Sequence, residues 1–277
     1  MDFIKNLMIL NQVENYKKKL VICVPYRNRE KHYKIFFSHI KNYFAYDKLD
    51  KYLNVSVVFT EQNNNKPFNL GKLNNICFEE NKNELDYIVI NNVDFLPIFA
   101  DYSYSDNPTV LISKGHDHHP IKPSSKFINK LKQPNIKYMF HGSVLISKKI
   151  FESVNGYSNN FWGWGYEDSD MRKRLIINNY EIHYRQGLYQ PLLHDNLGWD
   201  IAKNTEIIKT PINIKNNEIF KKNWQDKNYY KKDGLSCLKY QKIKEEINNS
   251  KETGEIIKVI QIGYLIKDRL LRPASVV

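Results

Sequence analysis

The chain has 277 residues, of which 42% are hydrophobic, and its 42 Lys and Arg outnumber 30 Asp and Glu to give a formal net charge of +12. This length and apolar content can bury a sizeable core, and we expect one large domain with a C-terminal extension. Three widely spaced cysteines exclude a disulfide framework and a cysteine-rich zinc module, whereas the positive charge favours anionic partners without choosing among nucleotides, nucleic acids and membrane surfaces.

Residues 1–20 are expected to form an N-terminal helix or extension. Their apolar patch, Leu7–Leu10, is too short for the hydrophobic core of a signal peptide and for a membrane-spanning helix. We therefore expect no membrane span and a cytoplasmic location for the chain as given, or a soluble form of something larger.

The next 60 residues alternate between strand and helix patterns. Two strands and two helices are predicted in alternation at 20–24, 31–44, 55–59 and 68–80. This order predicts a parallel sheet, in which ligands bind beyond the carboxyl ends of the strands. Arg27 and Arg29 follow the first strand, after Pro25 has stopped its apolar run, and are therefore candidates for a phosphate or base contact.

A third apolar strand, residues 86–90, ends in Asn91-Asn92-Val93-Asp94. A carboxylate that directly follows a buried strand is costly to bury unless a cation lies on it, which makes Asp94 a candidate metal ligand. The alternative is an aspartate that opens a turn before Pro97.

Strands are also expected over 109–113 and 143–147, with a helix after the second that ends near Asn155-Gly156. Between them lies Gly115-His116-Asp117-His118-His119. Adjacent side chains alternate in direction and seldom converge on one ion, so we interpret the histidines as a solvent-exposed loop.

The most unusual stretch is Phe161-Trp162-Gly163-Trp164-Gly165-Tyr166-Glu167-Asp168. Gly163 and Gly165 allow the backbone around Trp164 to bend, and an indole beside carboxylates is a combination that binds sugars. Glu167 or Asp168 could accept a proton from an attacking hydroxyl. Buried tryptophans followed by acids that cap the next helix remain an equal alternative.

The remaining predicted elements carry few candidate functional residues. We expect a strand at 181–185, a basic, helix-like stretch at 203–232, a strand from Asp233, a charged helix or loop at 243–255 and a closing strand at 256–262. His194, between the first two, is more often structural than a ligand when it stands alone, yet it could converge with Asp94.

Several short motifs form an ordered set from Val21 to about Gln241. They are Val24–Arg29, Phe68–Asn69, Asn92–Asp94, His141–Gly142, Asn155–Tyr157, Phe161–Gly165 with Glu167 and Asp168, His194, and Asp233–Leu235. This set resembles the beta-1,4-galactosyltransferase family of inverting, nucleotide-sugar-dependent glycosyltransferases. The resemblance implies an α/β protein with the GT-A fold, in which a Rossmann-like mixed sheet is flanked by helices. It also implies a donor-binding half over about 21–115, an acceptor-binding half over about 116–241, and a C-terminal helix and closing strand over 242–277.

Carried over by position, the resemblance assigns a role to each motif. Asp168 would be the catalytic base and Glu167 would hold the acceptor, while Asp94 and His194 would bind Mn²⁺ or a similar divalent cation. Residues that would bind substrate are Pro25, Tyr26, Arg27, Arg29, Phe68, Asn92, Val93, Met139, Gly142 and Trp164.

The chain also departs from the family pattern. Asn92 replaces the first acid of an Asp-Val-Asp motif, Leu70 replaces an arginine, and Pro191 stands where many members have a methionine ligand. We also expect no counterpart of the family's usual membrane anchor in the chain as given. Met139 replaces a common tyrosine, which would relax the choice between galactose and N-acetylgalactosamine.

These observations predict an enzyme that moves galactose or N-acetylgalactosamine from a UDP-sugar donor to a saccharide or glycoconjugate acceptor, with no nucleic-acid partner. Three alternatives remain. They are a metal-dependent hydrolase that uses His116–His119, a basic nucleic-acid-binding protein that lacks a recognisable module, and a catalytically weak or inactive sugar-binding homologue.

Overall fold

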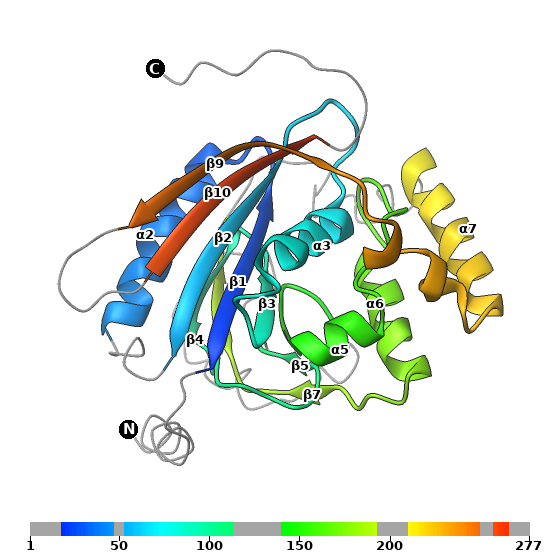
Figure 1. Ribbon diagram of the computed structural model, residues 1–277, viewed down its shortest axis with the longest axis horizontal. Coiled ribbons are helices and arrows are strands. Elements are labelled where there is room, and N and C mark those ends of the chain that lie inside the picture. Colours follow the sequence, from blue (N-terminus) through cyan, green and yellow to red (C-terminus); the bar gives the residue numbers. More distant parts are fainter. Residues whose placement is uncertain (1–17, 47–52, 113–139, 193–209, 250–256, 266–277) are drawn as a thin grey trace, which may run out of the picture.

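The computed structural model describes residues 18–46, 53–112, 140–192, 210–249 and 257–265 (Figure 1). Eight strands form one mixed sheet in the order β7-β5-β6-β3-β1-β2-β10-β9. Their bounds are β1 Lys19–Tyr26, β2 Asn54–Gln62, β3 Tyr87–Asn91, β5 Thr109–Val110, β6 Ser143–Ser147, β7 His183–Tyr184, β9 Gln241–Asn249 and β10 Ile257–Leu265. The predicted α/β class with a mixed sheet is confirmed.

The centre of the sheet is parallel. β1 pairs with β2 on one side and with β3 on the other, so that Cys23 lies between Val58 and Ile90. Every residue of β1 after Lys19 is buried, which explains why this strand is a continuous apolar run rather than an alternating one. Because β1, β2 and β3 run in the same direction, the segments that follow them leave the sheet at one shared edge.

Helices cover both faces of this sheet, with α2 behind it and α3 in front in Figure 1. The helix bounds are α2 Glu30–Tyr46, α3 Leu70–Asn81, α5 Lys148–Ser153, α6 Glu167–Ile177 and α7 Pro211–Gln225. A separate two-stranded sheet pairs β4, Phe95–Phe99, with β8, Leu188–Pro191. Within the described ranges, no helix is both long and apolar enough to cross a membrane.

Two predictions near the C-terminus are wrong. The expected strand from Asp233 is instead a turn followed by a short 3-10 helix, η5, Leu235–Cys237, because Asp233 turns its carboxylate inward and Gly234 has φ +138°. The segment from Ile243, expected as a charged helix or loop, belongs as far as Asn249 to β9. β9 is an edge strand beside β10, and charges along an edge strand protect it from pairing with other chains.

A buried ion network joins α6 to distant parts of the chain. Arg174 is fully buried and donates from Nε to Asp170 at 2.8 Å and from Nη2 to Asp233 at 3.2 Å. Its Nη1 donates to the carbonyl oxygens of Gly156 and Asp233. α6 is therefore held to the turn before the aromatic loop, which we define as Phe161–Tyr166, and to the segment that follows α7.

We expect Arg174→Leu to destabilise the protein by about 3 kcal/mol or more, because it leaves the carboxylates of Asp170 and Asp233 buried without their cation. Urea unfolding followed by circular dichroism measures this difference.

Arg172→Leu is the matched control on the same helix, since the Nε of Arg172 has no hydrogen-bond partner among the described residues. Its cost should stay below about 1 kcal/mol. Equal effects of the two changes would contradict a special role for the network.

Candidate active site

The loop after β2 and the end of β1 form one side of the candidate site. Arg27 donates to the carbonyl oxygens of Lys66 and Asn64, and its guanidinium lies 5.9 Å from the centre of the Phe68 ring. Partial burial lowers the pKa of Arg27, yet a guanidinium remains charged at neutral pH. The structure thus brings two of the predicted nucleotide-binding residues, Arg27 and Phe68, into contact.

The predicted binding residues next to Arg27, which are Pro25, Tyr26 and Arg29, make contacts within the protein core or at the start of α2. Pro25 is buried in the strand, and the Tyr26 hydroxyl donates to Glu61 at 3.2 Å while its ring stacks on Tyr33 at 5.5 Å. Arg29 is partly buried, and its carbonyl oxygen accepts the first hydrogen bond of α2 from Tyr33. Pro25 and Tyr26 therefore lie in the protein core, where they are not exposed to a ligand.

The turn after β3 carries Asp94. The Asn92 amide donates to the Gly142 carbonyl at 2.9 Å, and the Asp94 carbonyl accepts from the Leu192 amide at 2.7 Å. Val93, between them, is buried. The turn therefore lies between the chain entering β6 and the chain leaving β8, and Leu192 is two residues before His194. His194, Met139 and His116–His119 lie outside the described residues.

The chemistry of the two predicted metal ligands suits a hard divalent cation. Asp94 offers carboxylate oxygens and His194 an imidazole, a set that suits Mn²⁺. Nearby, the buried Asn91 Oδ1 has no hydrogen-bond donor among the described residues. Three or more His, Cys, Asp or Glu side chains do not gather around one point anywhere in the described part of the chain. Pro191, which is buried in β8, adds no donor atom.

The backbone of the aromatic loop contacts neighbouring segments at its two glycines, Gly163 and Gly165. The Gly163 amide donates to the Phe68 carbonyl at 2.7 Å, which connects the loop to the segment that carries Phe68, a predicted nucleotide-binding residue. A Cβ atom at Gly163 would lie 2.8 Å from Ile212, and one at Gly165 2.5 Å from Asn213. Both glycines have positive φ, so only glycine fits without strain. Trp164, between them, is 50% exposed.

Two asparagines of α7 hold the same loop, and sequence reasoning missed them. Asn213 donates to the Trp164 carbonyl at 3.2 Å, and Asn216 donates to the carbonyls of Trp162 and Gly165 at 2.9 and 3.1 Å. Both side chains are 2% exposed. The Thr210-Pro211 pair predicts the start of this helix, but nothing in an asparagine-rich sequence separates these two from the others.

Glu167 and Asp168 begin α6 directly after this loop. Burial raises the pKa of Glu167 to about 7, although its own amide and that of Gly165 donate to the carboxylate. Burial, and then the charge of Glu167, raise the pKa of Asp168 well above its usual range. Both carboxyl groups therefore bind a proton more readily than exposed carboxyl groups do, which suits general acids and bases.

Comparisons with known proteins match most of this chain to glycosyltransferases. A family model described as the N-terminal region of glycosyl transferase group 7 matches residues 12–105, and one described as the N-terminal domain of galactosyltransferase matches residues 123–194. A model of the GrpE family matches residues 239–277 and supports no statement about the site.

Mouse beta-1,4-galactosyltransferase 4 is 29% identical over 240 residues, which are 83% of this chain and 61% of that protein. Human beta-1,4-galactosyltransferase 1 is 30% identical over 166 residues, or 59% of this chain and 38% of that protein. The chain thus spans 61% of the length of the first of these relatives.

The solved catalytic domain of Drosophila beta-1,4-galactosyltransferase 7, in complex with xylobiose, aligns with a TM-score of 0.64 at 21% identity over 91% of this chain and 95% of that one. A mutant of the same protein, in complex with manganese, UDP-Gal and xylobiose, aligns with the same TM-score at 20% identity.

The mixed sheet, the helices on both faces and this structural likeness define a GT-A fold. The chain belongs to the beta-1,4-galactosyltransferase family.

The raised pKa of Glu167 predicts a pH dependence of stability. Between about pH 4.5 and 7 the carboxyl group ionises in the unfolded chain but keeps its proton in the folded one, so stability falls as pH rises through this window. Glu167→Gln should remove on the order of 1 to 2 kcal/mol of this fall, because a partly exposed group feels less than the full effect of burial.

Urea unfolding at pH 5 and pH 8 measures the change. Glu181→Gln, at a carboxyl group that is 83% exposed, is the control and should keep the wild-type difference. A Glu167→Gln variant with the wild-type difference would show that Glu167 ionises as an ordinary surface acid.

Proposed function

We propose that this protein is an inverting glycosyltransferase that moves galactose or N-acetylgalactosamine from a UDP-sugar to a hydroxyl group of a saccharide acceptor. The observation that carries this proposal is the pair of partly buried acids, Glu167 and Asp168, whose pKa values are raised directly beside a glycine-flanked, exposed tryptophan. In such an arrangement the flat ring can pack against a sugar, and a carboxyl group can accept the proton of a hydroxyl group.

In this proposal, Asp168 accepts the proton of the acceptor hydroxyl as its oxygen attacks the anomeric carbon of the donor. The bond between that carbon and the diphosphate oxygen breaks, and UDP leaves from the opposite side, which inverts the anomeric centre. Glu167 accepts a hydrogen bond from the acceptor and keeps the attacking oxygen in line. A raised pKa makes Asp168 a stronger base than an exposed aspartate once it is ionised.

The aromatic loop excludes water from this reaction. Trp164 packs over the donor sugar, while Arg27 and Phe68 hold the phosphates and the base. Because Gly163 is bonded to the Phe68 carbonyl, nucleotide binding and the position of the loop are mechanically linked. Asp94 and His194 would hold a divalent cation, whose charge would stabilise the diphosphate leaving group. The complex of the Drosophila relative with manganese, UDP-Gal and xylobiose supports these substrate and metal classes.

Asp168→Asn should abolish transfer and leave UDP-sugar binding nearly unchanged, because an amide cannot accept the acceptor proton. The expected loss in kcat is roughly a hundredfold to ten-thousandfold. Turnover of UDP-galactose and UDP-N-acetylgalactosamine with a panel of saccharide acceptors in the presence of manganese measures it.

Asp106→Asn, at an exposed aspartate of the β4–β5 connection, is the control and should retain full turnover. Near wild-type turnover by Asp168→Asn would remove Asp168 from the role of base. A wild-type protein that binds UDP-sugars but turns none over would instead identify an inactive, sugar-binding homologue, as the changes at Asn92 and Pro191 suggest.

Manganese should bind weakly to the free protein and at least about tenfold more tightly when UDP is present. Asp94 and His194 leave the other coordination positions to water and diphosphate oxygens, because Pro191 has no side-chain donor. Calorimetric titration of manganese, with and without UDP, measures the difference.

Asp94→Ala and His194→Ala should each lose metal-dependent activity, and His118→Ala should not. Tight manganese binding without UDP, or full activity in excess chelator, would contradict this metal site.

A further inference from the structure

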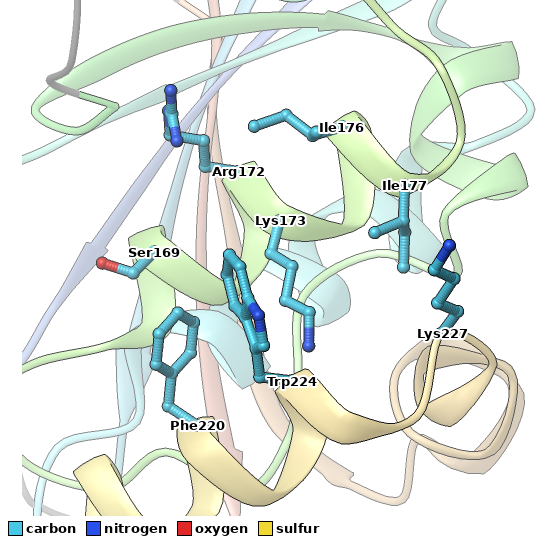
Figure 2. A pocket seen from close by; sticks show the side chains of 8 residues that line it. All are labelled: Ser169, Arg172, Lys173, Ile176, Ile177, Phe220, Trp224 and Lys227. Carbon is cyan, nitrogen blue, oxygen red and sulfur yellow. The ribbon is translucent and has the colours of Figure 1, made fainter.

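A crevice lies between α6 and α7, outside the residues assigned above to donor, metal and proton transfer (Figure 2). Its volume is about 360 Å³. One wall is the face of α6 that carries residues 169, 172, 173, 176 and 177 at helical spacing, and the other is formed by Phe220 and Trp224 of α7, with Lys227 at one end. This space is large enough for one or two sugar rings.

The aromatic side of the crevice connects it to the acids. The rings of Tyr166 and Phe220 are 5.4 Å apart, and those of Phe220 and Trp224 are 5.7 Å apart. Tyr166 directly precedes Glu167, so three neighbouring rings lead from the start of α6 into the crevice. Trp224 is 62% exposed, although α7 could bury an indole against α6. An exposed indole at the end of such a row is a surface on which a sugar ring packs.

The charged side chains of the crevice are all cationic. Lys173 is bonded to the Asn223 carbonyl and lies 4.8 Å from the Trp224 ring, so it is already engaged by the protein. The buried Nε of Arg172 has no hydrogen-bond partner among the described residues, and Lys227 is exposed. Figure 2 shows Lys227 at one end of the crevice, Trp224 on its α7 side, and Arg172 extending from α6 on the side away from Trp224. A carboxylate is absent from the residues that line it.

We propose that this crevice binds the part of the acceptor that lies beyond the sugar receiving the new residue, and that it selects an acceptor bearing a carboxylate or a phosphate. The proposal rests on the function proposed above. A ring of the acceptor packs on Trp224, and its anionic group pairs with the guanidinium of Arg172 or the ammonium of Lys227 in a charge-assisted contact.

Binding of saccharides to the full chain without donor tests this inference. The probes are a neutral trisaccharide, the same trisaccharide with a uronic acid or with a phosphate ester at its far end, and inorganic phosphate alone, each titrated by calorimetry in 0.15 M salt. The charged trisaccharides should bind at least about tenfold more tightly than the neutral one, and Arg172→Gln with Lys227→Gln should remove that difference. The two charged forms distinguish a carboxylate from a phosphate ligand.

Two further variants separate the ring contact from charge. Trp224→Leu should weaken all three trisaccharides, whereas Lys221→Gln, an exposed lysine of α7 outside the crevice, should change none of them. Equal binding of neutral and charged forms, or a preference that survives the Arg172→Gln and Lys227→Gln changes, would overturn the inference. Inorganic phosphate binding as tightly as the phosphorylated trisaccharide would overturn it as well, because the sugar would then contribute nothing.

Transfer kinetics separate this inference from the proposed function. With the charged acceptor, the double variant should raise KM about tenfold at unchanged kcat, and with the neutral acceptor KM should stay the same. Turnover without any preference for charge would refute the crevice alone. Charge-selective binding without turnover of any UDP-sugar would refute the transferase function alone.

Discussion

The buried guanidinium of Arg174 is the interaction on which the acidic end of α6 depends. A buried ion is stable only when its partners satisfy it, and Arg174 finds Asp170 on its own helix, Asp233 after α7 and the carbonyl of Gly156. These partners come from three separate segments. Because the loss of any of them would leave a hydrogen-bonding group of this buried network without its partner, the three segments adopt one relative position, and that position fixes the orientation of the N-terminal end of α6.

The network continues into the turn that precedes the aromatic loop. The carboxylate of Asp233 accepts from the hydroxyl of Ser158 and from the amide of Asn159, and Asn75 of α3 both donates to and accepts from the backbone of Tyr157. The chain therefore enters the aromatic loop from a rigid, hydrogen-bonded base. The loop itself is held through the Gly163 amide and the side-chain amides of the two asparagines of α7.

Much of this arrangement could be predicted from the sequence, and the failures have a physical pattern. Apolar runs located the central strands because strands buried on both faces need apolar side chains throughout. β9 was missed because an edge strand carries charges that also suit a helix, and Asp233 was assigned to a strand because its inward carboxylate depends on Arg174, 59 residues away. Partnerships of that kind, and the contacts of Asn213 and Asn216, leave no local pattern in the sequence.

The electrostatics of the acid pair follow from two opposing effects whose sizes differ. A carboxylate in the first turn of a helix is stabilised by the helix dipole by up to about 2 kcal/mol, which would lower its pKa by up to about 1.5 units. Burial of a carboxyl group raises its pKa by as much as about 3 to 5 units. Burial is therefore the larger effect, and the pKa of Glu167 lies near 7 despite the helix start and the two amides that donate to it. Because the amide of Gly165 in the aromatic loop donates to this carboxylate and lowers its pKa, the position of the loop affects the basicity of the acid beside it.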